Sequence, residues 1–193
     1  MEEQKKVNAL LDSLDQGRRI LFGVHMLKRL APNYFYFIRQ ENFGDPNLIP
    51  RVIEAAKLFF AEPQKAEVAA SELMEPLDKA APDSEDYGSV YSTYALDACC
   101  VCYDIIQLII KNEPEAAHRV SNVPIDTLYV YVQDQILTEE ESASLGIIFS
   151  TPQIQNEITF QVKLIERLKS NAPLDDLIDE AFSTTYDSII GLK

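Results

Sequence analysis

Apolar residues spaced three and four positions apart run along almost the whole chain, and this pattern restricts the fold more than any other feature. The first two stripes lie at residues 7–14 and 20–30, on either side of a Gln16–Gly17 break. Because an α-helix turns once every 3.6 residues, such spacing places apolar side chains on one helical face. We therefore expect two amphipathic helices ahead of Pro32.

Prolines and capping residues mark where further helices begin and end. Pro32 predicts an end or a kink, because proline has no backbone N–H to donate. Asp45 followed by Pro46 predicts the next helix start, or Asn47 caps a slightly later one. The remaining helices are expected at about 64–81 with a distortion at Pro76, from an Asp83–Asp86 cap to about 111, at 115–137 with a kink at Pro124, at 152–169, and from 173 to near 191.

The pattern as a whole predicts an all-α fold. Residues 128–132 alternate like a strand and could pair with residues 147–149, so a hairpin there stays open as an alternative. The chain has no internal repeat and no linker rich in Gly, Ser or Pro. We expect a single domain over residues 1–193, a multi-helix bundle of seven to nine helices around a long central helix.

The central helix contains the most apolar window of the chain, residues 94–110. This window is shorter than the roughly 20 residues that cross a bilayer, and it carries Asp97, Asp104 and Gln107. It therefore predicts a core helix rather than a membrane span.

Charge and cysteine content indicate an acidic cytoplasmic protein. The formal net charge of −14 repels phosphate backbones and anionic lipids, so neither nucleic acid nor a membrane is an expected partner. Such a surface maintains solubility or meets a basic partner. The N-terminal residues lack the apolar core of a signal peptide, and three cysteines within four positions fit a reducing compartment. A protein partner and a homodimer are both compatible with the sequence.

No motif defines a catalytic, cofactor or metal site. Cys99 and Cys102 share a helical face, but the two histidines, His25 and His118, are isolated and in no ligand spacing. A buried cysteine on an apolar helix is also a poor nucleophile. The acidic pairs Glu72/Glu75 and Asp176/Asp179 have the spacing of magnesium-binding helical nucleotide hydrolases, yet such pairs occur here no more often than chance in an acid-rich chain.

A tyrosine stripe on the central helix is the remaining candidate. Tyr87, Tyr91 and Tyr94 share a face that continues into the core, and Asp97 lies at its edge. If Asp97 is buried, it needs a hydrogen bond from a tyrosine, an arginine or a helix N-terminus, or it lines a small pocket. Arg18 and Arg29, three helical turns apart, could similarly form a basic spot for an anion.

Three stretches resemble a known family. They are Ala31-Pro32-Asn33-Tyr34 with Phe37, then Asn42-Phe43-Gly44-Asp45, then Leu96-Asp97-Ala98-Cys99. They are similar to the YjaG-like bacterial family of unknown function, which implies an all-helical fold, no established activity and a weak link to histidine-kinase signalling. The cysteine run at 99–102 and Pro124 depart from that family's pattern.

We expect a non-enzymatic helical interaction or regulatory module with no cofactor. The alternative is a metal-dependent nucleotide hydrolase or a small-molecule-binding protein. The residues expected to matter, structurally or as a pocket, are Asn33, Tyr34, Asp45, Tyr91, Tyr94 and Asp97.

Overall fold

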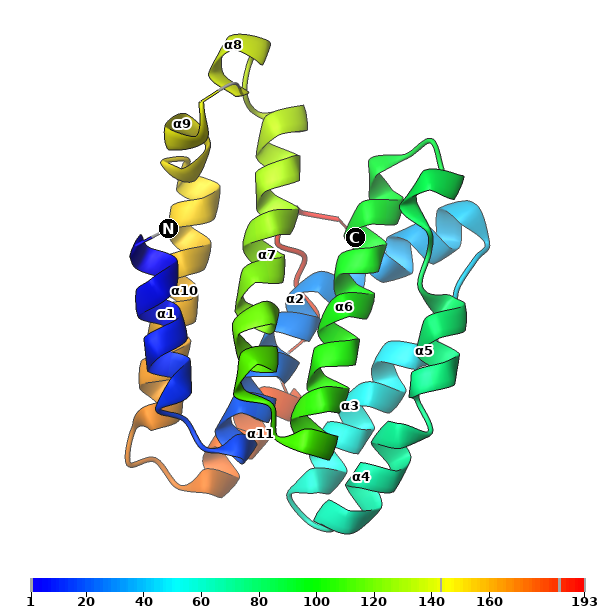
Figure 1. Cartoon of the computed structure of the whole chain (residues 1–193), viewed down its shortest axis with the longest axis vertical. Helices are drawn as coiled ribbons and strands as arrows, with labels where there is room; N and C mark the ends of the chain where they lie inside the picture. Colours follow the sequence, from blue (N-terminus) through cyan, green and yellow to red (C-terminus); the bar gives the residue numbers. More distant parts are fainter. Residues whose placement is uncertain (1, 143, 184, 193) are drawn as a thin grey trace.

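The computed structural model describes residues 2–142, 144–183 and 185–192, except the side chains of residues 2, 3 and 84. These residues form helices and connecting segments with no strand, so the all-α bundle is confirmed (Figure 1). The helices are α1 (Glu2–Asp12), α2 (Gln16–Glu41), α3 (Leu48–Phe59), α4 (Pro63–Ser71), α5 (Met74–Ala80), the 3₁₀ turn η1 (Ser84–Asp86), α6 (Val90–Lys111), α7 (Pro114–Gln135), α8 (Glu139–Ser142), α9 (Leu145–Phe149), α10 (Pro152–Lys169) and α11 (Leu174–Ser183).

Helices α2 and α6 pack side by side at the centre, with α3, α4 and α5 on one side and α7, α1 and α10 on the other (Figure 1). A Cβ atom built on Gly23 of α2 would lie only 2.8 Å from Cγ1 of Ile105 on α6. Glycine at this position therefore permits the close approach of the two helices. The window expected to form a core helix lies within α6, and most of its side chains are buried.

Helix α6 is also the one described helix that is long and apolar enough to span a membrane by length and composition. Two-thirds of the relevant segment, 67%, is buried inside the protein, as in a core helix.

Pro32 interrupts the backbone hydrogen bonding inside α2, but the helix continues past it. It has no N–H for the carbonyl of Lys28, four residues earlier, and its ring crowds that carbonyl. The backbone N–H of Asp187 donates to this carbonyl oxygen over 3.3 Å, and that of Ile189 donates to the carbonyl of Arg29 over 3.3 Å. The segment 185–192 therefore runs along α2.

This segment explains why the last helix is shorter than predicted. Helix α11 ends at Ser183 rather than near Gly191. The backbone donors that would continue it, at Asp187 and Ile189, are engaged by α2 instead.

The region predicted as one helix at 64–81 is two helices, α4 and α5, separated at Glu72 and Leu73. Pro76 does not cause the break. It lies in the first turn of α5, where backbone N–H groups have no helical partner in any case.

Two predicted helix starts are later than the acidic caps suggested. Asn47 directly precedes α3, so the later start is correct, but its side chain makes no capping hydrogen bond to a described residue. Asp45 instead accepts a hydrogen bond from the Asn47 N–H at 2.8 Å. Asp83 caps the 3₁₀ turn η1, and Ser89 caps α6 by accepting from the Tyr91 N–H at 3.3 Å. The hairpin alternative is wrong, because residues 128–132 belong to α7 and residues 147–149 to α9.

Candidate functional site

Tyr34 holds the turn between α2 and α3. The backbone N–H of Asp45 donates to the Tyr34 hydroxyl at 3.0 Å, and this hydroxyl donates to the Asp45 carbonyl at 3.3 Å. Gly44 has a φ of 113°, in the left-handed region that favours glycine, and a Cβ there would lie 3.0 Å from the same hydroxyl oxygen. Burial raises the pKa of Tyr34. Tyr34 therefore shapes the turn.

Asn33, next to Tyr34, is fully buried and contacts the C-terminal segment. Its Oδ1 accepts from the Ser188 hydroxyl at 3.0 Å, while its Nδ2 has no partner among the described residues. Asn33 thus fastens segment 185–192 to α2.

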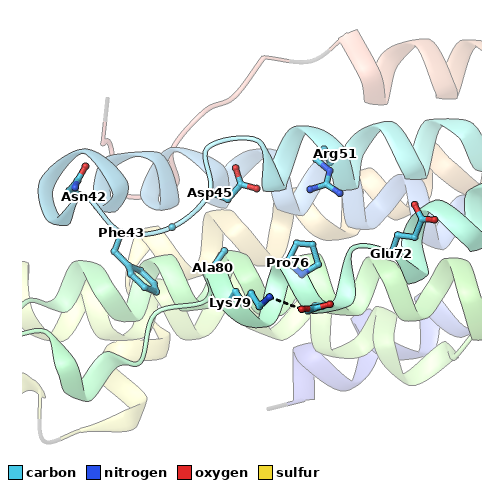
Figure 2. A pocket seen from close by; sticks show the side chains of 10 residues that line it. Asn42, Phe43, Asp45, Arg51, Glu72, Pro76, Lys79 and Ala80 are labelled. Atoms are coloured by element: carbon cyan, nitrogen blue, oxygen red, sulfur yellow. Dashed lines mark hydrogen bonds and ion pairs between the residues drawn. The ribbon is translucent and has the colours of Figure 1, made fainter.

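A hollow of about 740 Å³ lies between the α2–α3 turn and helices α4 and α5 (Figure 2). It brings Asp45 together with the predicted acidic pair Glu72 and Glu75, but Arg51 and Lys79 also line it. Glu75 and Lys79 form an ion pair at 2.5 Å, drawn as a dashed line in Figure 2.

The second acidic pair, Asp176 and Asp179, lies on α11 and does not line this hollow. Within the described part of the chain, no three His, Cys, Asp or Glu residues are placed to hold a metal ion together. The donor set of a magnesium-dependent hydrolase is thus not assembled in that part.

Only Tyr91 and Tyr94 of the predicted tyrosine stripe lie on α6, and they pack into an apolar cluster where α6, α7, α9 and α10 meet. Tyr87 precedes α6 and packs its ring against Phe37 and Phe43 instead. Tyr94 is fully buried with no hydrogen-bond partner for its hydroxyl among the described residues, and burial raises its pKa. The Tyr91 ring is half-buried, with its centroid 4.7 Å from that of Tyr36 and 6.1 Å from that of Tyr94. Both residues contribute packing.

Asp97 faces α7 and is hydrogen-bonded there. The Thr127 hydroxyl donates to Asp97 Oδ2 at 2.6 Å. Burial, with a smaller contribution from the nearby Asp126 carboxylate, raises the pKa of Asp97 to about 6. The expectation of a hydrogen-bonded Asp97 holds, but with a threonine as the donor.

Two helical turns further along α6, Asp104 is only 3% exposed. It pairs with Arg119 of α7, with 2.7 Å between Arg119 Nε and Asp104 Oδ1. Sequence reasoning missed both Thr127 and Arg119. The position of the turn at Asn112 could have predicted both partners. Helices α6 and α7 form an antiparallel hairpin, so residues equally distant from the turn face one another. Asp97 and Thr127 each lie fifteen positions from Asn112.

Two adjoining hollows line the outer face of α6 and share Cys100 and Tyr103; we call them together the α6 groove. The first, about 210 Å³, lies against α5, and the second, about 450 Å³, lies against α7. Tyr103 is 41% exposed between them. The α6 groove is lined by Met74, Leu77, Asp78, Ala81, Leu96, Cys99, Cys100, Tyr103, Asp104, Arg119, Asn122, Val123 and Asp126.

The cysteines of α6 are poorly suited to nucleophilic chemistry. Cys99 and Cys102 are buried, and burial raises the pKa of each thiol. Cys100 is the exposed cysteine and lies in the groove, where partial desolvation of its thiol, and then the Asp97 and Asp104 carboxylates, raise its pKa. A raised pKa keeps the thiol protonated and unreactive.

The fold and its surface define an all-α bundle protein built on two central helices, with charged hollows on its outer faces. The chain belongs to the family described as protein of unknown function (DUF416), whose model matches residues 6–181. It is similar to the uncharacterized protein YjaG of Salmonella typhimurium, with 26% identity over 80% of this chain and 81% of the relative, and to YjaG of Escherichia coli, with 24% identity over 86% and 83%. The resemblance expected from the sequence motifs is thus confirmed.

A solved structure supports the same fold. The crystal structure of a DUF416 family protein from Shewanella baltica matches with a TM-score of 0.78 at 20% identity, covering 96% of this chain and 97% of the other.

Proposed function

We propose that this protein is a non-enzymatic cytoplasmic interaction module whose α6 groove binds a basic amphipathic helix of a partner protein. The observation that carries the proposal is a set of carboxylates that pair with no basic side chain in the described part of the chain and lie beside an apolar floor. An amphipathic helix with basic flanks supplies both complements, since its apolar face fills a groove while its cations meet the acids.

Acidic side chains outnumber basic ones in and beside the α6 groove. Asp78 and Asp126 line it. Asp97 lines neither hollow but lies close by, since its carboxylate raises the pKa of Cys100 and the Asp126 carboxylate raises the pKa of Asp97. The one basic side chain among the described lining residues, Arg119, is already paired with Asp104. A cation from a partner would therefore meet unneutralised carboxylates.

Asp97 is the carboxylate whose ionised form a cation from the partner would stabilise. Its pKa of about 6 means that burial makes the ionised form costly in the free protein. A lysine or arginine placed beside it would stabilise the ionised carboxylate. The net charge of −14 would also steer a basic partner towards the protein and would make association salt-dependent.

The floor of the groove supplies apolar contact. Leu96, Tyr103 and Val123 are half-buried or exposed along α6 and α7, and Met74 closes the α5 side. Aromatic side chains such as Tyr103 contribute strongly to interfaces. Tyr103 is therefore the expected centre of the contact.

The test uses two synthetic helical peptides with the same leucine face, one carrying lysines and the other glutamates on its polar face. Labelled peptide binding is followed by fluorescence anisotropy and mapped by NMR. We expect only the lysine peptide, and not the glutamate peptide, to bind and to shift the amide signals of Tyr103, Val123 and Asp126.

Variants separate groove binding from general charge attraction. Asp97→Asn with Asp126→Asn should weaken the lysine peptide about tenfold, whereas Asp176→Asn with Asp179→Asn removes the same charge from exposed positions on α11 and should change binding less than twofold. Equal losses in both double variants, or signal shifts elsewhere, would refute the groove. Magnesium-dependent turnover in a nucleotide panel would favour the hydrolase alternative instead.

A further inference from the structure

A basic hollow of about 410 Å³ lies between α2, α10, α11 and the segment that follows α11, and it shares no lining residue with the α6 groove. Among its lining residues, two acids face four bases, although the whole chain has a net charge of −14. The acids are Glu180 and Asp187, and the bases are Lys28, Arg29, Lys163 and Arg167. This local excess of positive charge opposes the overall field of the protein.

The predicted basic spot from Arg18 and Arg29 is not formed. Arg18 pairs with Asp15 and donates to the Leu168 carbonyl at 2.7 Å, and it does not line the hollow. Arg29 instead joins Lys28, its neighbour in α2, at the hollow.

Lys28 and His25 form the inner part of this site. Lys28 is only 5% exposed, and its Nζ donates to the carbonyls of Ala181 and Phe182 at 2.9 and 3.0 Å, which fixes the ammonium in place. His25, one turn earlier, is 7% exposed and lines the hollow. No hydrogen bond joins its ring to another described residue.

The His25 ring is neutral at pH 7. Its pKa is lowered to about 4, chiefly by burial and further by Lys28 and Arg29, while Glu180 acts in the opposite direction. A neutral imidazole has one N–H to donate and one lone pair to accept with. Because His25 lines the hollow, a ligand there can accept a hydrogen bond from its N–H.

Two of the outer basic side chains of the hollow, Arg29 and Arg167, already form ion pairs. Arg29 pairs with Glu157 at 2.5 Å and lies over the Phe160 ring with its guanidinium carbon 4.2 Å from the centroid, while its buried Nε has no partner among the described residues. Arg167 pairs with Glu180 at 3.0 Å. Lys163 is exposed and has no ion pair within the described part of the chain.

We propose that this hollow is a binding site for a small phosphomonoester, with the phosphoryl group held by Lys163 and the His25 N–H beside the fixed positive charge of Lys28. With Arg29 paired to Glu157 and Arg167 to Glu180, Lys28 and Lys163 face the single carboxylate of Asp187, so the hollow keeps a positive charge that favours an anionic group such as a phosphoryl group. Phe160 and Leu164 give the organic part of the ligand an apolar wall. A cation that is buried and held by carbonyls, such as Lys28, is already ordered for binding.

The test follows the two histidine rings of the chain by NMR, since His25 lines the hollow and His118, which contacts Asp12 at 2.7 Å, does not. The probes are phenyl phosphate, inorganic phosphate and benzoate. Phenyl phosphate should shift the His25 signals and leave those of His118 unchanged. Inorganic phosphate, which lacks the ring, and benzoate, which is a monoanion, should each bind at least fivefold more weakly.

A matched pair of variants locates the interaction. Lys163→Gln should weaken phenyl phosphate about tenfold, and Lys169→Gln, at an exposed position on the same helix, should have less than a twofold effect. Neither lysine is buried, so both variants should fold. No His25 shift with millimolar phenyl phosphate, equal effects of the two variants, or benzoate binding as tightly as phenyl phosphate would overturn the proposal.

Discussion

The backbone N–H of Asp187 donates to the carbonyl oxygen of Lys28 over 3.3 Å, and this is the carbonyl that Pro32 deprives of its helical partner. A missing donor inside α2 thus becomes the attachment point for a segment far away in the sequence. Because Thr185 and Asp187 also line the basic hollow, the attachment completes that hollow.

Pro32→Ala should loosen this attachment. Alanine restores an N–H that competes with Asp187 for the Lys28 carbonyl. We expect hydrogen exchange at the Asp187 and Ile189 amides to accelerate at least about tenfold, which corresponds to about 1.4 kcal/mol of local protection. Pro124→Ala in α7 is the control and should leave both amides unchanged; unaltered exchange in the Pro32 variant would contradict the mechanism.

Tyr34→Phe should destabilise the turn between α2 and α3. The change leaves the Asp45 N–H without its acceptor, at a cost of about 1–2 kcal/mol. Urea denaturation measures the loss, and exchange of the Asp45 amide should accelerate. Tyr186→Phe, at an exposed ring, should cost much less. Equal stabilities would show that the hydroxyl does not hold the turn.

Asp97→Asn should stabilise the free protein at neutral pH. The pKa of Asp97 is about 6 in the folded protein, above its ordinary value of 3.8, so the ionised form disfavours folding and stability falls as the pH rises through this window. We expect a gain of about 1–2 kcal/mol at pH 7.5 that disappears by about pH 4. Urea denaturation at both pH values tests this. A loss of stability at pH 7.5 would contradict it.

The same Asp97 variant should bind the lysine peptide more weakly. A gain in stability combined with a loss of binding distinguishes a carboxylate kept for recognition from one that only supports the fold.

Arg119→Ala should cost about 3 kcal/mol, because it leaves the buried Asp104 carboxylate unpaired. Adding Asp104→Asn should recover most of the loss, since the buried charge is then absent. Thermal or urea unfolding of the single and double variants forms the cycle. Additive losses would indicate that the pair is not coupled.

His25 should make the protein less stable in mild acid. Its pKa is about 4 when folded, below the ordinary value of 6.5, so between these values the unfolded chain binds a proton that the folded protein excludes. Relative to His25→Gln, the wild-type chain should lose about 2 kcal/mol between pH 7.5 and pH 5. His118→Gln is the matched control, and parallel pH curves for all three proteins would refute the assignment.

The spacing of apolar residues predicted the helix bounds well where the residues at the helix ends act through local capping and dipole interactions. Pro152 opens α10 and Lys111 closes α6 as expected, because caps and helix dipoles act within one turn. The end of α11 was not predictable in this way, since segment 185–192 is directed by carbonyls of α2 that only the folded structure brings near.

The candidate residues show the same division. Asn33 and Tyr34 were singled out by the family-like motif and Asp97 by its place at the edge of an apolar helical face, and each accepts a hydrogen bond from another part of the chain. Their partners could not be read from periodicity alone. The basic hollow was missed because its cations come from α2 and α10, and only the packing of these helices places Lys28 opposite Lys163.

The α6–α7 hairpin constrains chain length as well as residue type. One extra residue beside Asn112 would rotate every following position of α7 by about 100° relative to α6, and both the Asp97–Thr127 and the Asp104–Arg119 contacts would be lost together. Relatives that keep these pairs should therefore tolerate substitutions in this connection but no single-residue insertion or deletion.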